Sequence, residues 1–341
     1  MRYKTIKHHN RILSILDQRL LPHKVVYRKA RTAYDVYRAI KDMILRGAPL
    51  IGVTAAWGIA LEAQRLSGRE FRKKLKKAIN LIRRARPTAR NLFWACARME
   101  RLIDQNREDD KILKKRLLLE AEKIEQEDVA ACEKIGRYGA PLIHNGDKVM
   151  VYCNAGALAT AGIGTALGVL YTAKQEGKKF TVYACETRPW LQGARLTTWE
   201  LNQAGIKTYL LCDNMAGAFM EDIDLVLVGA DRIAVNGDVA NKIGTKGLAI
   251  VARYFNVPLY VAAPVTTFDF RIGSGEEIEI EFRKEEEVKS IAGKLIAPRN
   301  IKAINPAFDI TPNTLITGII TDRGIIYPPY KNKIKKLSPP R

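Results

Sequence analysis

The hydrophobic pattern of this chain changes once, at the turn-forming residues Asn145-Gly146-Asp147. From about Thr32 to Ile143, apolar residues recur at the three- and four-residue spacing of amphipathic helices. After the turn, short apolar runs rich in β-branched residues alternate with segments long enough to hold a helix. The two patterns bury their apolar faces in different ways, and 341 residues exceed the usual size of one core. We therefore predict a smaller, mainly helical domain over 1–144 and a second domain over 145–341.

The apolar runs of the second half predict a parallel β-sheet. Strand segments separated by helical segments are typical of βαβ units, and their repetition favours a Rossmann-like α/β fold. The expected strands are Lys148–Cys153, Phe180–Cys185, Lys207–Cys212, Asp224–Val228 and Pro258–Ala263. Such sheets bind ligands at the carboxyl ends of their strands. Residues that directly follow each run are therefore the first candidates for a functional site.

The helical half is interrupted twice. Gly47-Ala48-Pro49 and Arg86-Pro87-Thr88 break the pattern, and Pro is favoured at the first position of a helix. Residues 1–30 contain shorter apolar segments, and they are the part of this half in which we expect strands.

The chain is strongly basic. It carries 57 Lys and Arg against 36 Asp and Glu, a net charge of +21 that raises the question of a nucleic-acid partner. The basic residues concentrate in Arg72–Arg86 and Lys331–Arg341. In the first segment Leu75, Ile79 and Ile82 recur at helical spacing, which predicts an amphipathic helix with a charged outer face. Because no aromatic residues are interleaved to stack on bases, we expect a solvated basic surface and no nucleic-acid partner.

The cysteines and the N-terminus indicate a cytoplasmic location. The five cysteines form no CxxC pair and are odd in number, which favours reduced thiols, and the N-terminus lacks the apolar stretch of a secretion signal. The uncharged stretch Met150–Ala173 is long enough to cross a bilayer. Its glycines, threonines and Asn154 favour a strand, a loop and a helix instead, so we expect no membrane contact.

Polar residues follow four of the expected strands. They are Cys153-Asn154-Ala155-Gly156, Glu186-Thr187-Arg188-Pro189, Asp213-Asn214 and Gly229-Ala230-Asp231-Arg232. Because parallel strands end at one edge of their sheet, these four loops are expected to converge.

The glycine-rich segment Asn154–Gly168 in the first loop suggests a phosphate site. Its sequence, NAGALATAGIGTALG, would let backbone amides approach an anion at a helix N-terminus, where the helix dipole also favours negative charge. The segment lacks the Lys of a P-loop and the GxGxxG spacing of dinucleotide sites. Close helix packing explains its glycines nearly as well.

Two residues at this edge have the chemistry of acid–base catalysts. Buried cysteines are usually inert, but a thiol near a helix N-terminus, as expected for Cys153, has a lowered pKa and serves as a base or nucleophile. The other four cysteines lie within helix or strand patterns and are expected to be inert: Cys96, Cys132, Cys185 and Cys212. Asp231 follows the run DLVLVGA. It either caps a helix or pairs with Arg232, or else it is buried with a raised pKa and acts as a general acid.

No histidine pattern indicates a metal centre. His8, His9, His23 and His144 show neither HxH nor HExxH spacing. We expect no metal and no other cofactor.

Seven segments identify a family resemblance. They are RGAPLIG at Arg46–Gly52, RPTARNLFWA at Arg86–Ala95, Cys153–Gly168, ETRPWLQGARLT at Glu186–Thr197, DNMAG at Asp213–Gly217, GADRIAVNGDVANK at Gly229–Lys242 and NPAFD at Asn305–Asp309. In this order they resemble the methylthioribose-1-phosphate isomerase family, whose superfamily includes the regulatory subunits of translation initiation factor 2B. Arg90 and Cys185 depart from the family pattern, where an apolar residue and an Asp are frequent, and either change is able to alter the pocket wall.

The resemblance implies that Cys153 and Asp231 are the catalytic pair. It also implies that seven residues hold the substrate, with the arginines and the lysine near its phosphate: Arg46, Gly47, Ala48, Arg86, Gln192, Asn241 and Lys242. The implied reaction is the aldose–ketose isomerisation of 5-methylthioribose 1-phosphate to 5-methylthioribulose 1-phosphate in methionine salvage. Proton transfer through an enolate and a hydride shift between C2 and C1 both remain open.

Two other functions remain open beside this one. The first is an isomerase of ribose 1,5-bisphosphate or 5-deoxyribose 1-phosphate, although RGAPLIG and NLFWA favour the methylthio substrate. The second is a non-catalytic subunit of the initiation-factor type, which has no reason to keep Cys153 together with Asp231.

The resemblance further implies a homodimer formed through the C-terminal sheet domain. The apolar runs Leu315–Ile320 and Ile325–Pro329 fit an interface, but they fit completion of the chain's own core equally well.

Overall fold

The N-terminal strands expected within residues 1–30 are present. The computed structural model describes residues 3–86, 89–105 and 109–338. Its chain begins with an antiparallel sheet of β1 (Ile6–His9), β2 (Ile12–Leu16) and β3 (Tyr27–Ala30). The inward side chains of this sheet, Ile6, Leu13 and Ile15 among them, join the core of the helices that follow.

Five helices form the rest of the N-terminal half, as the period predicted. They are α1 (Ala33–Lys41), α2 (Ala48–Arg65), α3 (Phe71–Arg83), α4 (Arg90–Gln105) and α5 (Asp110–Gly139). Helix α2 is buried over Ala48–Ala63 because it is apolar on all sides and is packed against the other four helices. The predicted break before α4 is confirmed, because α3 ends at Arg83 and α4 begins at Arg90. Pro87 and Thr88 themselves lie outside the described residues.

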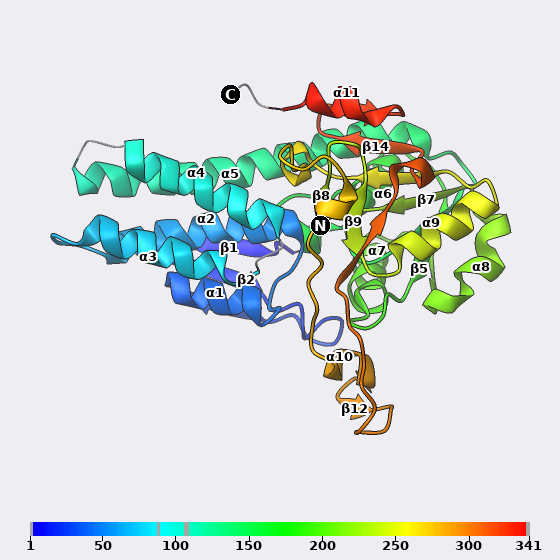
Figure 1. Ribbon diagram of the computed structural model, residues 1–341, viewed down its shortest axis with the longest axis horizontal. Helices are drawn as coiled ribbons and strands as arrows, with labels where there is room; N and C mark the ends of the chain where they lie inside the picture. Colours follow the sequence, from blue (N-terminus) through cyan, green and yellow to red (C-terminus); the bar gives the residue numbers. More distant parts are fainter. Residues whose placement is uncertain (1–2, 87–88, 106–108, 339–341) are drawn as a thin grey trace.

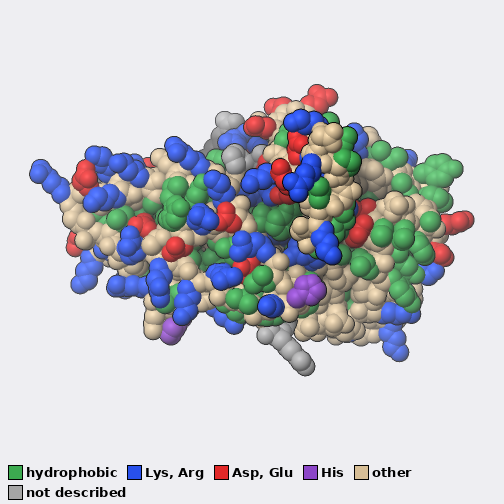
Figure 2. All heavy atoms as spheres, turned by 90° about the horizontal axis from the view of Figure 1, so that it is seen from below, with side chains coloured by type: hydrophobic (Ala, Val, Ile, Leu, Met, Phe, Trp, Pro, Cys, Tyr) green, Lys and Arg blue, Asp and Glu red, His purple; other side chains and the backbone are tan. Residues whose placement is uncertain are grey.

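Helix α3 confirms the amphipathic interpretation of the basic segment. Leu75, Ile79 and Ile82 are fully buried, whereas the intervening lysines are exposed. Some of these lysines lie beside acidic side chains, as in the Lys76–Asp104 pair. Figure 2 likewise shows Lys and Arg side chains distributed over the surface and interspersed with acidic and uncharged ones.

The second half is built on one seven-stranded sheet. Its spatial order is β15 (Gly324–Ile326), β14 (Gly318–Thr321), β10 (Leu259–Ala262), β7 (Leu225–Val228), β4 (Lys148–Val151), β5 (Thr181–Cys185) and β6 (Thr208–Leu211). All neighbouring pairs are parallel except β14 and β15. The five predicted strands are confirmed, and β7 is the central strand with β4 beside it.

Apolar clusters cover both faces of this sheet. The helices of this half are α6 (Ala166–Gln175), α7 (Thr198–Gln203), α8 (Ala216–Phe219), α9 (Thr245–Tyr254) and α11 (Tyr330–Lys335). Helix α5 belongs to both halves, because Leu113–Ile124 pack in the helical core and Ile135 packs under the sheet. Met150–Ala173 comprises the end of β4, a loop and most of α6, and no helix among the described residues has the length and apolarity needed to span a membrane.

The second half also contains a small sheet and a projecting arm. Strands β8 (Arg232–Ile233), β9 (Val239–Lys242) and β13 (Phe308–Thr311) form an antiparallel sheet. Helix α10 (Glu286–Lys289), β11 (Ser290–Ile291) and β12 (Lys294–Leu295) form an arm that projects from the body of the molecule (Figure 1).

Candidate active site

A cavity opens where the sheet meets the N-terminus of α2. Its empty space, part of which is open to solvent, measures about 630 Å³, and it lies at the carboxyl ends of β4 and β7, as expected for a parallel sheet. All nine residues predicted to act on or hold a substrate line it: Arg46, Gly47, Ala48, Arg86, Cys153, Gln192, Asp231, Asn241 and Lys242. The fold thus brings together residues that are almost 200 positions apart in the chain.

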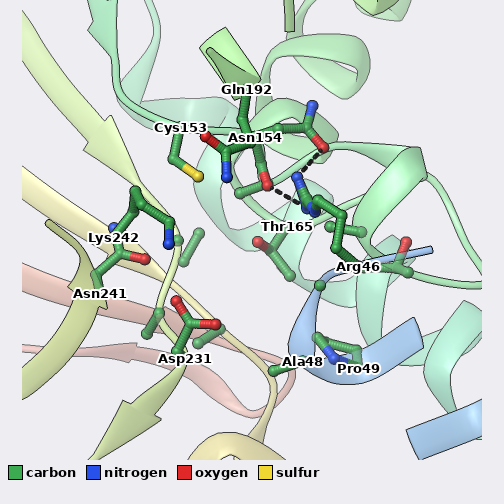
Figure 3. A pocket seen from close by; sticks show the side chains of 18 of the residues that line it. Arg46, Ala48, Pro49, Cys153, Asn154, Thr165, Gln192, Asp231, Asn241 and Lys242 are labelled. Carbon is green, nitrogen blue, oxygen red and sulfur yellow. Dashed lines mark hydrogen bonds between the residues drawn. The ribbon is translucent and has the colours of Figure 1, made fainter. Parts of the chain in front are cut away.

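Cys153 lies two residues past the end of β4, in a left-handed backbone conformation with φ of 61°. Two threonines hold this turn: the Cys153 amide donates to Thr187 Oγ1 at 2.8 Å, and its carbonyl accepts from Thr197 Oγ1 at 2.6 Å. In Figure 3 the thiol points into the cavity, as does the Asp231 carboxylate opposite it, with the Lys242 amine beside them.

The expectation of a lowered thiol pKa is wrong. Burial raises the pKa of Cys153, and the nearby cations Arg46 and Lys242 only partly oppose this effect. The expectation assumed a helix N-terminus next to Cys153. The α6 helix begins only at Ala166, after a loop that contains a single 3-10 turn at Ala157–Ala159. The lowering influences on the pKa of Cys153 are therefore the cationic side chains and the backbone amide of Asn154.

Asp231 has the raised pKa that the general-acid interpretation requires. Burial raises the pKa of its carboxyl, against the lowering effect of Lys242 and Arg86. The pairing with Arg232 is wrong, because the Arg232 guanidinium binds Asp269 instead. The Asp231 amide donates to Ala240 O at 2.9 Å, which fixes the residue between β7 and β9.

Three cationic side chains surround the thiol and the carboxyl. Arg46, 6% exposed, donates from Nη1 and Nη2 to the side chain and the carbonyl of Asn154, at 2.8 and 2.7 Å. Lys242 donates to Ala307 O at 2.8 Å. Arg86 lies 3.7 Å from Glu281. Burial lowers the pKa values of Arg46 and Lys242, so an anionic ligand would restore the stability of both charges.

Two amide side chains complete the predicted set. Asn241 on β9 donates from Nδ2 to Thr245 Oγ1 at 3.0 Å. The Oδ1 atom of Asn241 takes no part in that bond. Gln192 is 2% exposed, and its Oε1 finds no hydrogen-bond partner in the described part of the chain. A buried acceptor without a donor is unusual in a folded protein, which fits a group kept for a ligand.

Gly47 and Ala48 place the N-terminus of α2 at the cavity. Gly47 has a φ of 101°, and a Cβ there would lie 2.5 Å from backbone atoms of Ala159. Helix α2 is 18 residues long and has no side-chain N-cap, so its first backbone amides have no side-chain acceptor there. Because Gly47 and Ala48 line the cavity, the positive end of the helix dipole faces it.

The glycine-rich loop contributes less to anion binding than its sequence suggested. Most of its amides are used within the protein: those of Ala157 and Leu158 donate to Glu200, and that of Ala161 donates to Asp128. Those of Thr165 and Leu167 donate to Ala155 O. The close contact of Gly156 with Gly164 shows that the glycines serve mainly packing.

Several lining residues had not been predicted. Met43, Tyr152, Thr165 and Phe308 also border the cavity. The Phe308 ring lies 4.7 Å from Lys242 Nζ, within cation–π distance. Phe308 belongs to the NPAFD segment, so the family resemblance could have predicted it as a site residue. Met43 and Tyr152 belong to none of the segments that carry the resemblance.

The departures from the family pattern lie away from the cavity. Arg90 lines a separate cavity and lies 3.7 Å from Asp269. Cys185 is buried at the end of β5, and burial raises its pKa to about 12.

Three of the remaining thiols, Cys96, Cys132 and Cys185, are buried as expected of inert cysteines, whereas the placement of Cys212 within a strand is wrong. All five are free. Burial raises the pKa of Cys96 to about 12 and that of Cys132 well above its usual value. Cys212 lies just beyond β6 and is exposed. Within the described residues, no group of three or more His, Cys, Asp or Glu side chains could hold a metal ion.

An α/β protein whose sheet edge gathers a thiol, a carboxyl group and three cations around one cavity has the features of an enzyme. Comparison with known proteins defines the class. Residues 45–328 match the family model of the initiation factor 2 subunit family. Methylthioribose-1-phosphate isomerase of Thermotoga neapolitana is 50% identical over 339 residues, 99% of this chain and 98% of that protein.

Solved structures agree with this comparison. The crystal structure of 5-methylthioribose 1-phosphate isomerase from Pyrococcus horikoshii is 41% identical, with a TM-score of 0.90 over 98% of this chain and 95% of that one. A structure described as translation initiation factor eIF-2B subunit delta from A. fulgidus is 43% identical, with a TM-score of 0.86 over 98% of both chains. The chain belongs to the methylthioribose-1-phosphate isomerase family, within the initiation factor 2 subunit family, and is an enzyme of the aldose–ketose isomerase class.

Proposed function

We propose that this enzyme converts 5-methylthioribose 1-phosphate to 5-methylthioribulose 1-phosphate in methionine salvage, with Cys153 and Asp231 as its acid–base pair. The name of the Thermotoga neapolitana relative supports the substrate. The observation that carries the catalytic roles is the shared cavity of a thiol and a carboxyl group among Arg46, Arg86 and Lys242.

The substrate requires a proton donor. Its phosphate is attached to the anomeric oxygen, so the ring cannot open spontaneously to an aldehyde. Asp231 donates a proton to the ring oxygen as the bond between C1 and that oxygen breaks. The thiolate of Cys153 takes the proton from C2, which gives an enol that carries the phosphate on C1.

The second half of the reaction restores both groups. The Cys153 thiol returns a proton to C1, and the C2 hydroxyl gives its proton to the Asp231 carboxylate as the ketone forms. The product is the ketose 1-phosphate. No external oxidant or reductant is needed, because C1 is reduced while C2 is oxidised.

The environments of the two groups suit these roles unequally. The raised pKa of Asp231 favours the protonated form that a general acid needs. Cys153 also has a raised pKa, and Arg46 and Lys242 are the groups that stabilise its thiolate. We therefore expect the reactive form, with a protonated Asp231 and an ionised Cys153, to be a minor species of the free enzyme.

The cavity lining favours an apolar substituent on the sugar. Met43, Pro49, Pro264 and Phe308 border the cavity together with the cations. A methylthio group would be buried favourably against such side chains, whereas the second phosphate of ribose 1,5-bisphosphate would lose hydration there.

A coupled assay tests the proposal. The purified chain is incubated with methylthioribose 1-phosphate, 5-deoxyribose 1-phosphate or ribose 1,5-bisphosphate, and the ketose is measured. We expect the highest kcat/KM for the methylthio sugar. A higher value for the bisphosphate would overturn the substrate, and no ketose from any of them would leave the chain among the non-catalytic subunits.

Deuterium oxide separates the two chemical routes. Proton transfer through the exchangeable Cys153 thiol predicts carbon-bound deuterium at C1 of the product. A product without deuterium at C1 would indicate a hydride shift.

We also propose a homodimer formed through the sheet domain. The runs Leu315–Ile320 and Ile325–Pro329 are largely absorbed by the chain's own core, since Ile319 and Ile320 are fully buried. The support comes from exposed apolar side chains around the edge strand β6 and helices α8 and α9. They are Tyr209, Met215, Phe219, Ile250 and Tyr254. Apolar side chains also gather at this end of the molecule in Figure 2.

Light scattering tests the dimer. A large apolar interface resists dilution and salt, so we expect twice the chain mass at low micromolar protein and molar salt. A mass near 38.3 kDa would mean a monomer.

A further inference from the structure

A buried carboxylate lies directly behind the wall of the active-site cavity. Glu200 on α7 is 2% exposed and does not line the cavity itself. Its two oxygens accept five hydrogen bonds. The donors are Asn154 Nδ2 at 2.8 Å, Ala157 N at 2.7 Å, Leu158 N at 3.3 Å, the Tyr3 hydroxyl at 2.9 Å and the Tyr171 hydroxyl at 3.3 Å.

One of these donors connects the carboxylate to the cavity. The Asn154 side chain donates from Nδ2 to Glu200 at 2.8 Å and to Thr197 Oγ1 at 3.2 Å, and it accepts at Oδ1 from Arg46. These partners determine which way the amide faces, and Glu200 is the charged one on the Nδ2 side. Figure 3 shows the two bonds by which Arg46 holds Asn154 at the cavity wall. The Arg46 guanidinium is thus joined to the Glu200 carboxylate through a single amide group.

We propose that Glu200 is a positioning residue, which fixes Asn154 and through it holds the Arg46 guanidinium where a substrate phosphate binds. The inference rests on the proposed function only in that Arg46 serves a phosphorylated substrate. Glu200 acts without touching the substrate. Together with the larger contributions of Cys153 and Asp231, it also supplies negative charge that offsets the buried Arg46 cation before an anionic ligand arrives.

The surroundings of Glu200 are shaped around its charge. A Cβ at position 156 would lie 2.5 Å from both carboxylate oxygens, so Gly156 leaves the space that they occupy. Burial raises the pKa of Glu200, and the bonds from Asn154, Tyr3, Leu158 and Ala157 oppose that effect. All five donors are suited to an ionised acceptor, and two of them are backbone amides that cannot turn away.

The N-terminal segment contributes to the same assembly. Tyr3 bonds to Glu200, Thr5 Oγ1 donates to Ala157 O at 2.9 Å, and Gln18 Nε2 donates to Leu158 O at 2.7 Å. Tyr3, Thr5 and Gln18 therefore fasten the loop whose other side lines the cavity. Removal of Tyr3's hydroxyl offers a milder test of the same network.

The test variant is Glu200→Gln. Glutamine keeps the shape, but one of its terminal atoms becomes an NH₂ group that cannot accept from Asn154 or from Ala157. Loss of a charge-assisted bond behind Arg46 should raise KM for methylthioribose 1-phosphate on the order of tenfold. We expect kcat to change by less than about threefold, because the phosphate is bound alike in the substrate and the transition state.

Glu62→Gln is the matched control. Glu62 is also a buried carboxylate that accepts a backbone amide, from Ala33 at 2.9 Å, but it lies in the helical core. Both variants should lose thermal stability. In Glu62→Gln, KM and the rise of the thermal midpoint in millimolar inorganic phosphate should equal those of the wild type, whereas in Glu200→Gln the phosphate-induced rise should be smaller.

A double-variant cycle tests the route through Arg46. If Glu200 acts through that guanidinium, Glu200→Gln should add little to the rise in KM caused by Arg46→Lys. Fully additive effects would overturn the proposal. If Glu200→Gln does not fold, Tyr3→Phe replaces it, with an expected rise in KM of about twofold to fivefold; an unchanged KM in Tyr3→Phe would then overturn it.

The outcomes separate this inference from the proposed function. If the wild type binds phosphate but does not isomerise methylthioribose 1-phosphate, the substrate is wrong, and a reduced phosphate effect in Glu200→Gln still supports the role of Glu200. If the wild type is active and Glu200→Gln matches Glu62→Gln in KM and in phosphate response, Glu200 is only structural.

Discussion

The two sides of the loop 154–160 treat their buried polar groups in opposite ways. Behind the loop, Glu200 accepts five hydrogen bonds, and the Asn154 side chain bonds at both ends. On the cavity side, Gln192 Oε1 and Arg86 Nε lack hydrogen-bond partners among the described residues. The Asp231 carboxyl there accepts no hydrogen bond from the described residues, and burial raises its pKa.

The difference separates groups that stabilise the fold from groups kept for a ligand. A buried polar group contributes to stability when it is paired and opposes folding when it is not. Substitutions behind the loop should therefore reduce stability, and substitutions on the cavity side should reduce activity at little or no cost in stability.

The largest expected effect is the loss of turnover in Cys153→Ser. A serine hydroxyl is a far weaker acid than even a thiol with a raised pKa, so kcat should fall at least on the order of a thousandfold. The thermal midpoint should stay within about 2 °C of the wild type, because the two side chains are similar in size. Cys212→Ser, at an exposed thiol, is the control. Activity above a few per cent would remove Cys153 from the mechanism.

Asp231→Asn should bind substrate without converting it, with a loss of kcat on the order of a hundredfold or more. The stability of this variant should rise although its activity falls. The folded-state pKa of Asp231 is raised, so its ionised form opposes folding at pH values above that pKa. Removal of the charge should stabilise the protein at neutral pH, and the gain should shrink as pH falls towards the unfolded pKa. A variant that failed to fold would make Asp231 structural.

Asp128 sharpens the comparison, because it lies behind the loop yet is poorly paired. Its carboxyl accepts from Ala161 N at 2.7 Å, and burial raises its pKa to about 7, with Glu125 adding to the rise. The charged form therefore opposes folding above pH 7, and this penalty declines as pH falls from 7 towards about 4.

Asp128→Asn keeps an acceptor for Ala161 and removes the charge. We expect denaturant unfolding at pH 8 to show a gain of about 2 kcal/mol that declines steadily between pH 7 and pH 4. A loss of stability of Asp128→Asn at pH 8 would contradict the idea that the poor pairing of the Asp128 carboxylate makes its charge unfavourable for folding.

The smallest expected effect is that of a chelator. Exhaustive dialysis should leave activity unchanged, because the described residues contain no cluster of metal ligands on either side of the loop. Loss of activity that a divalent ion restores would contradict this prediction.

The sequence by itself determined the fold class and the location of the site. The change of period at Asn145-Gly146-Asp147 predicted the α/β sheet and the helical half, because a helix and a strand bury apolar residues at different spacings. The rule that loops at the carboxyl ends of parallel strands converge led to the right edge of the sheet. The resemblance then selected nine residues, all of which line one cavity.

Only the tertiary structure decided the electrostatics of that cavity. Cys153 is adjacent in sequence to a glycine-rich loop, which suggested a helix dipole, but the loop turns its amides towards Glu200 and Asp128 and the helix begins later. The pKa of a group depends on burial and on charges that approach from distant segments, such as Arg46 and Lys242. Sequence spacing records none of these distances, so the role of Glu200 emerged only from the folded chain.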